Sequence, residues 1–123
     1  MYNLTLDTSH FPAQNDAEIR DISVGELLRE VANSNPNTIA MVDVLENGDC
    51  GQSWTYADML VQAEQLAQAL ATRFEAHERI VVWAPNIPEW VFMEYAAGLA
   101  GLVLVTANPS FQSTELKYVL EQS

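Results

Sequence analysis

The chain has 123 residues, which suffices for a single domain with a hydrophobic core. Its formal net charge is −12, because 17 acidic side chains stand against only five basic ones. This balance argues against a nucleic-acid surface and against an anionic membrane face, both of which need clustered lysine and arginine. We expect the acidic side chains to form a solvated exterior.

Cysteine and histidine are too sparse to predict a disulfide framework or a metal centre. Cys50 is the only cysteine, and its Gly-Asp-Cys-Gly setting is typical of a turn. His10 and His77 show no ligand spacing. No signal peptide is recognisable at the N-terminus, and the longest apolar run, residues 95–105, is too short to span a bilayer. We therefore expect a cytoplasmic protein.

The first elements expected are a surface arm over residues 1–22 and a helix that begins after Ser23. Ser23 and Glu26 have the spacing of a capping box, and the run from Asn33 to Pro36 ends the helix. Apolar residues recur at helical spacing and predict one buried stripe, made of Val24, Leu27, Leu28, Val31 and Ala32.

A hairpin and a second helix follow. The pattern predicts a strand over residues 38–45, a turn over 46–51 and a short return strand over 52–54. Thr55 is a good N-cap for the second helix, with Asp58 near its free amides. The predicted buried stripe of this helix comprises Met59, Ala63, Leu66, Ala67, Leu70 and Phe74.

Two continuous apolar runs, residues 79–84 and 102–105, are typical of parallel strands covered on both faces. The helix-length segment 89–101 between them supplies the crossover that parallel neighbours need. A loop over 106–112 then leads to a last helix, capped by Ser113 or Thr114.

The expected fold is therefore α/β: an N-terminal helix and hairpin followed by a partial parallel sheet in βαβα order. Such a unit requires a third strand, and none follows the last helix. We expect residues 23–123 to be the truncated N-terminal part of a larger layered α/β domain.

A phosphate-binding loop is not predicted within this chain. The loop after the first parallel strand, residues 84–88, has two prolines and no glycine, so it lacks the backbone amides that would cradle an anion. Gly98 and Gly101 lie within and at the end of the crossover helix, where close packing or a C-cap explains them.

Other acidic and basic residues also have simpler roles than catalysis. A phospho-acceptor domain would need an acidic cluster, an exposed aspartate at a strand end and a lysine distant in sequence, whereas Asp43 lies within the hairpin pattern and the only lysine, Lys117, lies on the last helix. Glu89 and Glu94 are five residues apart, which does not place them on one helix face. No residue of the chain is assigned a catalytic, cofactor-binding or metal-binding role.

Four motifs in order identify a family. They are Trp-Thr-Tyr-Ala-Asp-Met-Leu at 54–60, Arg-Ile-Val-Val-Trp-Ala-Pro-Asn-Ile-Pro-Glu-Trp at 79–90, the segment 96–109 and the segment 114–120. Together they closely resemble the N-terminal region of the adenylate-forming acyl-CoA synthetases, the AMP-binding superfamily.

The resemblance implies an enzyme that joins a carboxylate to the α-phosphate of ATP, releases pyrophosphate and then forms a thioester with coenzyme A. ATP, Mg²⁺ and CoA are thus implied for the whole enzyme, whereas this chain holds none of the segments that bind them. In the family the phosphate loop, the adenine segment and the catalytic lysine lie further downstream. Some relatives carry a basic residue near CoA at the position of Leu99, and leucine does not support that contact.

The sequence therefore predicts an N-terminal fragment of an ATP-dependent acyl-CoA synthetase, inactive alone. Its expected partner is the remainder of the synthetase, or a second copy of the chain that pairs through the unfinished sheet. The alternative from another class is a freestanding interaction module that binds a partner through an open sheet edge.

Overall fold

The structure is a computed structural model that describes residues 17–123. Residues 1–16, which include most of the predicted arm and His10, lie outside the described residues. The elements are α1 (Val24–Ser34), β1 (Ile39–Val44), β2 (Cys50–Thr55), α2 (Tyr56–Ala71), β3 (Arg79–Trp83), α3 (Pro88–Leu99), β4 (Val103–Ala107) and α4 (Ser113–Gln122).

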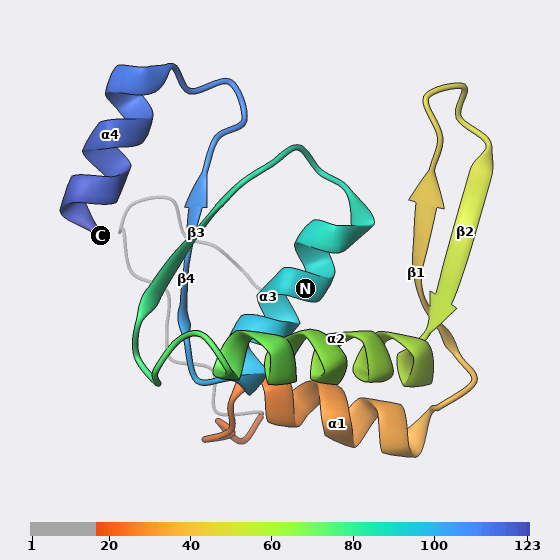
Figure 1. The fold of residues 1–123 in the computed structure, drawn as a ribbon. Coiled ribbons are helices and arrows are strands. Elements are labelled where there is room, and N and C mark those ends of the chain that lie inside the picture. Colours follow the sequence, from red (N-terminus) through yellow and green to blue (C-terminus); the bar gives the residue numbers. More distant parts are fainter. Residues whose placement is uncertain (1–16) are drawn as a thin grey trace, which may run out of the picture.

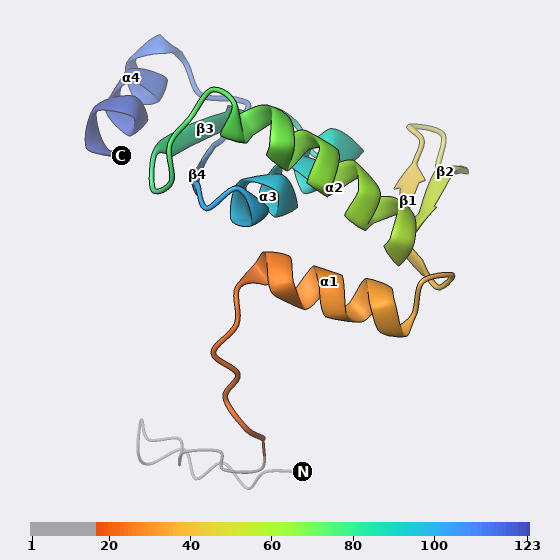
Figure 2. The same cartoon turned by 60° about the horizontal axis from the view of Figure 1, so that its bottom comes forward.

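These elements form an α/β fold with two small sheets, as Figure 1 shows, and the predicted fold class is confirmed. Strands β1 and β2 pair antiparallel, and β3 and β4 pair parallel, with Arg79 opposite Val103 and Trp83 opposite Ala107. Helices α1, α2 and α3 pack on one another between the two sheets. Helix α4 lies beyond β4, well away from α1, in both views (Figures 1 and 2).

The helices begin where local capping chemistry predicts. Ser23 and Glu26 form a complete capping box, in which each side chain accepts a hydrogen bond from the other residue's backbone N–H. Thr55 and Asp58 do the same for α2. Helix α4 differs from the expectation, because its N-cap is Gln112 rather than Ser113 or Thr114.

The core lies between α2 and α3 and has two buried clusters. Ala67, Leu70, Ala96, Ala97 and Leu102 form the first, on which Ile80 of β3 and Leu104 of β4 pack. Leu28, Met59, Ala63 and Phe92 form the second, under the hairpin. The Trp54 ring meets the Phe92 ring edge-on, with centroids 5.6 Å apart, which couples the hairpin to α3.

Two predicted stripes are partly wrong. On α1 the buried residues are Gly25, Leu28 and Ala32, whereas Val24 and Leu27 are 54% and 43% exposed. The buried face of α1 includes Gly25, which lies against Leu99 of α3, and an apolar pattern does not count glycine. On α2 the stripe is confirmed up to Leu70, but the helix ends at Ala71, and Phe74 lies beyond it and is 38% exposed.

The two apolar runs pair as parallel strands, as predicted, and their sheet has two strands in the described part of the chain. Ile80 and Leu104 face the helical core, but Trp83 and Val103 are 51% and 44% exposed. Helix α4 has no fully buried residue, and its Leu116 and Val119 are half-buried. The β3–β4 sheet thus exposes apolar surface at Trp83 and Val103, whereas Val81 and Val105 between them are half-buried.

Candidate functional site at the carboxyl edge of the parallel strands

In open α/β folds, ligands bind beyond the carboxyl ends of the parallel strands. Here the segments that follow β3 and β4 are residues 84–87 and 108–112. The Trp83 indole Nε1 donates to the backbone oxygen of Asn108 across 3.0 Å, which ties the two segments together. The Asn108 side-chain oxygen accepts the Ser110 backbone N–H at 2.9 Å. Hydrogen bonds between and within the two segments therefore stabilise this edge.

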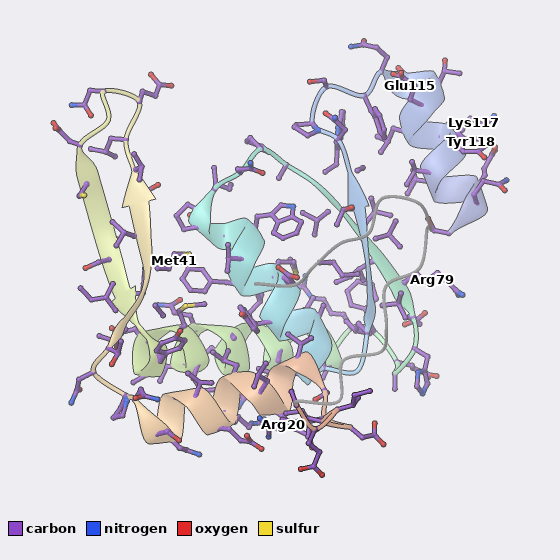
Figure 3. All side chains as sticks on the ribbon, turned by 180° about the vertical axis from the view of Figure 1, so that it is seen from behind. Arg20, Met41, Arg79, Glu115, Lys117 and Tyr118 are labelled. Atoms are coloured by element: carbon purple, nitrogen blue, oxygen red, sulfur yellow. The ribbon has the colours of Figure 1, made fainter. Side chains whose placement is uncertain are left out.

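The edge carries no positive side chain in the described part of the chain. Arg29 pairs with Glu64 on the α1–α2 face at 2.9 Å, and Lys117 pairs with Glu121 on α4 at 3.5 Å. Arg79 begins β3 and so lies at the opposite edge of the sheet, as Figure 3 shows. A triphosphate at the carboxyl edge would meet no basic side chain from segments 84–87 and 108–112.

The residues that the sequence analysis considered as candidate site residues do not form a common site in the structure. Cys50 is exposed in β2 rather than in the turn. His77 has a positive φ of 71° and donates its backbone N–H to the Gly101 oxygen, so its role is in the α2–β3 connection. Glu89 and Glu94 are both exposed on α3. Among residues 17–123 no three His, Cys, Asp or Glu side chains are placed to hold a metal ion.

Leu99 has a packing role. Its side chain contacts both core clusters and lies against Gly25 of α1. On the neighbouring turn, burial raises the pKa of the Tyr95 hydroxyl, and the nearby Glu94 carboxylate raises it further. Tyr95 thus stays protonated over the neutral range, and its half-buried side chain packs against the hairpin-side cluster.

A groove that sequence reasoning missed lies between β1 and the N-terminal end of α3. It has a volume of about 500 Å³, and its walls are residues 41–44 on one side and residues 86–88, 90 and 91 on the other. Asp43 is the one acidic residue in these walls. Aspartate is uncommon in strands, so an aspartate inside an otherwise apolar strand is the one feature of the sequence that could have indicated this groove.

Comparison with known proteins identifies the family. The family model described as AMP-binding enzyme matches residues 28–123. The chain is 31% identical over 119 residues to the medium-chain acyl-CoA ligase ACSF2, mitochondrial, of Danio rerio, a match that covers 96% of this chain and 19% of that protein. The N-terminal domain of FACL13 from Mycobacterium tuberculosis superposes with a TM-score of 0.75 at 26% identity, over 83% of this chain and 25% of that domain.

The chain therefore belongs to the AMP-binding enzyme family and corresponds to the N-terminal part of its acyl-CoA synthetase members. It spans only about one fifth of the length of the ligase relative named above. No helix within residues 17–123 has the length and apolar character needed to cross a membrane.

Proposed function

We propose that this chain is the N-terminal part of an ATP-dependent acyl-CoA ligase, and that it supplies structure rather than reacting groups. The observation that carries the proposal is the family match over residues 28–123. The named ligase relative supports the same reaction class, carboxylate activation followed by thioester formation. The ATP, Mg²⁺ and CoA of that reaction would be bound by segments outside this chain.

The isolated chain is proposed to be inactive. Adenylate formation requires preorganised donors and cations around a developing negative charge. The carboxyl edge of β3 and β4 offers neutral amides and no cation in the described residues, and its loop 84–88 contains two prolines. Residues 23–123 are proposed to be one structural unit within the larger domain, with residues 1–22 as an arm.

The exposed face of the β3–β4 sheet is the proposed contact surface for the rest of the ligase. A parallel sheet is normally covered on both faces. In this chain Trp83 and Val103 expose apolar surface, and Leu120 of α4 is 55% exposed. The alternative function, a freestanding interaction module, would use the same surface and the same unpaired strand edges. The cytoplasmic location stays a prediction, and the ACSF2 relatives carry a mitochondrial name.

The test is to determine the reading frame downstream of the Ser123 codon and to assay its product. The proposal expects an in-frame segment rich in serine, threonine and glycine, and a longer protein that releases pyrophosphate only when ATP–Mg²⁺ and a carboxylic acid are both present. The 123-residue chain, assayed beside it with acids from acetate to long-chain length, should release none. A natural stop codon after Ser123 would favour the interaction module instead.

A further inference from the structure

The tip of the β1–β2 hairpin is a tight loop over residues 45–49. The Gly48 backbone N–H donates to the Leu45 oxygen at 2.8 Å, and the Leu45 N–H donates to the Asp49 oxygen at 2.9 Å. Gly48 has a φ of 85°. This combination is typical of a three-residue hairpin loop that ends in a left-handed glycine. Figure 1 shows the loop at the free end of the hairpin, away from the helices, and Asn47 stands directly before its glycine.

Asn47 is the one asparagine of the chain that precedes a glycine. Asparagine is a chemically labile residue, because the backbone nitrogen that follows it can attack its own side-chain Cγ and close a five-membered imide ring. A glycine nitrogen is the least hindered for this attack, since glycine has no side chain. The other candidates are worse placed. Asn35 and Asn108 precede prolines, which have no N–H, and Asn86 precedes the β-branched Ile87.

The peptide bond after Asn47 is open to solvent and is restrained only by the hydrogen bonds of the loop. Residues 44–50 are all exposed, and a Cβ on Gly48 would meet no atom within 4 Å. The Asn47 Oδ1 accepts the Asp49 backbone N–H at 3.1 Å, and the Asn47 Nδ2 donates to the Asp49 Oδ2 at 2.7 Å. With the bond from Gly48 to Leu45, these contacts engage both the side-chain amide and the attacking nitrogen. Exposed bonds of this kind open locally without unfolding of the core.

We propose that Asn47 is a site of spontaneous deamidation, which proceeds when the hairpin tip opens. A solvent base takes the proton of the Gly48 backbone nitrogen, and this nitrogen forms a bond to the Asn47 Cγ. The Cγ–Nδ2 bond breaks, and the amide nitrogen takes a proton from water and leaves as ammonia. Water then adds to either carbonyl of the imide and opens the ring, which leaves aspartate or isoaspartate at position 47. The net change is the gain of one water molecule and the loss of one ammonia.

The product alters the hairpin in two ways. Either acid adds a negative charge between Glu46 and Asp49, which are both acidic already. Isoaspartate also routes the main chain through the former side chain, which inserts one extra carbon before Gly48. The hydrogen bond from Gly48 to Leu45 depends on the normal spacing of the chain and should then be lost. The inference is independent of the proposed ligase function, since it needs only the hairpin tip.

The experiment compares the folded 123-residue chain with a blocked peptide that has the sequence of residues 44–49, acetyl-Val-Leu-Glu-Asn-Gly-Asp-amide, in one neutral buffer. Isoelectric focusing follows the added charge, fragment mass spectrometry locates it, and labelling by an isoaspartyl methyltransferase measures the isoaspartate. The chain should convert at Asn47 before any other asparagine. It should react about tenfold more slowly than the peptide, because the hydrogen bonds of the tip must open first. In a urea concentration that unfolds the chain, the two rates should agree.

Two matched variants test the role of the loop hydrogen bonds. Asp49→Ala removes the acceptor of the Asn47 side-chain amide, whereas Glu46→Ala removes a neighbouring carboxylate that makes no hydrogen bond to Asn47. Each substitution is also made in the peptide, so that its direct effect on reactivity cancels in the ratio of the peptide rate to the chain rate. This ratio should fall about threefold for Asp49→Ala, as expected from the loss of one exposed hydrogen bond to a charged group. It should not change for Glu46→Ala.

Asn47→Gln should abolish the early conversion, because glutamine would have to form a larger ring. The proposal is overturned by first conversion at another asparagine, or by a folded chain that reacts as fast as the peptide. It is also overturned by equal ratios for Asp49→Ala and Glu46→Ala. An Asn47 that stays intact long after a reaction about tenfold slower than the peptide's would have finished contradicts it as well.

Discussion

Gly25 in the first turn of α1 lies directly against Leu99 at the end of α3. A Cβ on Gly25 would be 2.7 Å from the Leu99 Cδ2 and 3.3 Å from its Cα, so a side chain at this position would force Leu99 to shift. This contact sets the rotation of α1, since it turns Gly25, Leu28 and Ala32 toward the core.

The Gly25→Ala variant should therefore unfold more easily than the wild type. Overpacking of this kind costs about 1–3 kcal/mol, because the Leu99 side chain would have to leave its place against both core clusters and its Cα would have to shift as well. Alanine also improves helix propensity, by at most about 1 kcal/mol, which does not offset the clash. Urea denaturation gives the free energy of unfolding directly.

Gly98→Ala is the matched control, because it makes the same change on the facing helix, next to Leu99, at a position with room for a methyl group. A Cβ there would have the Gly25 nitrogen as its nearest neighbour, at an ordinary 3.8 Å. Helix propensity alone should then stabilise the protein by about 0.5–1 kcal/mol. If Gly25→Ala and Gly98→Ala changed the free energy of unfolding in the same direction, this result would contradict a close contact between Gly25 and Leu99.

Gly101→Val should destabilise the chain through backbone strain. Gly101 has a φ of 72°, and the Leu102 N–H donates to the Ala97 oxygen at 2.9 Å, so the end of α3 is a Schellman motif. A Cβ at Gly101 would find its nearest atom at 3.7 Å, so space is not limiting. The left-handed conformation itself should cost about 1–3 kcal/mol for valine. Gly101→Asn should lose less in the same melting experiment.

The capping-box carboxylates should make stability depend on pH in the acid range. Hydrogen bonds from the Ser23 backbone and side chain lower the pKa of Glu26, and those from the Thr55 side chain and backbone lower the pKa of Asp58. A carboxyl with a lower pKa in the folded state stabilises the fold above its unfolded pKa. That contribution is lost as the pH falls through the folded pKa.

The double variant Glu26→Gln, Asp58→Asn lacks both capping carboxylates. Comparing it with the wild type therefore separates their contribution from the change in stability that protonation of the other acidic side chains causes in both proteins. The free energy of unfolding of the wild type should exceed that of the double variant by a constant amount at neutral pH. The difference should shrink below about pH 4, where both carboxyls become protonated. A difference that did not change between neutral pH and pH 3 would contradict the capping role of the charges.

The open face of the β3–β4 sheet should make the isolated chain self-associate at high micromolar concentration. Val103→Lys places a charge on that face and should weaken association about tenfold, since an apolar contact is lost. Val61→Lys makes the same charge change on α2, where Val61 is 53% exposed, and should have little effect. Sedimentation velocity at several concentrations distinguishes these outcomes from a monodisperse monomer, which would mean that the chain closes its own core.

The starts of α1 and α2 and the end of α3 could be predicted from the sequence, because they depend on contacts between residues close in sequence. Ser23, Thr55 and Gly101 act through atoms within a few residues of themselves, so their roles can be seen without a fold. The face of α1 could not be predicted in this way, because Gly25 acts through a helix distant in sequence. Phe74 was misplaced because the pattern continued past the residue where α2 ends.

The groove beside β1 was beyond sequence reasoning for a related reason. Its walls come from β1 and from the start of α3, and the packing of Trp54 on Phe92 decides how closely the hairpin approaches that helix. The sheet of β3 and β4 was expected to be unfinished, but which of its apolar side chains are exposed could not be predicted from the sequence. An apolar run indicates that a strand is suited to burial, and it does not indicate which chain segment covers it.

The central claim is that this chain forms the N-terminal part of an acyl-CoA ligase, and a chimera tests it most directly. The chain would replace the matching N-terminal region of the Danio rerio ligase, and pyrophosphate release would be measured with ATP–Mg²⁺ and medium-chain acids. The account predicts acid-dependent pyrophosphate release by the chimera and none by the 123-residue chain alone. A chimera that melts cooperatively and binds ATP, yet releases no pyrophosphate with any acid, would contradict it.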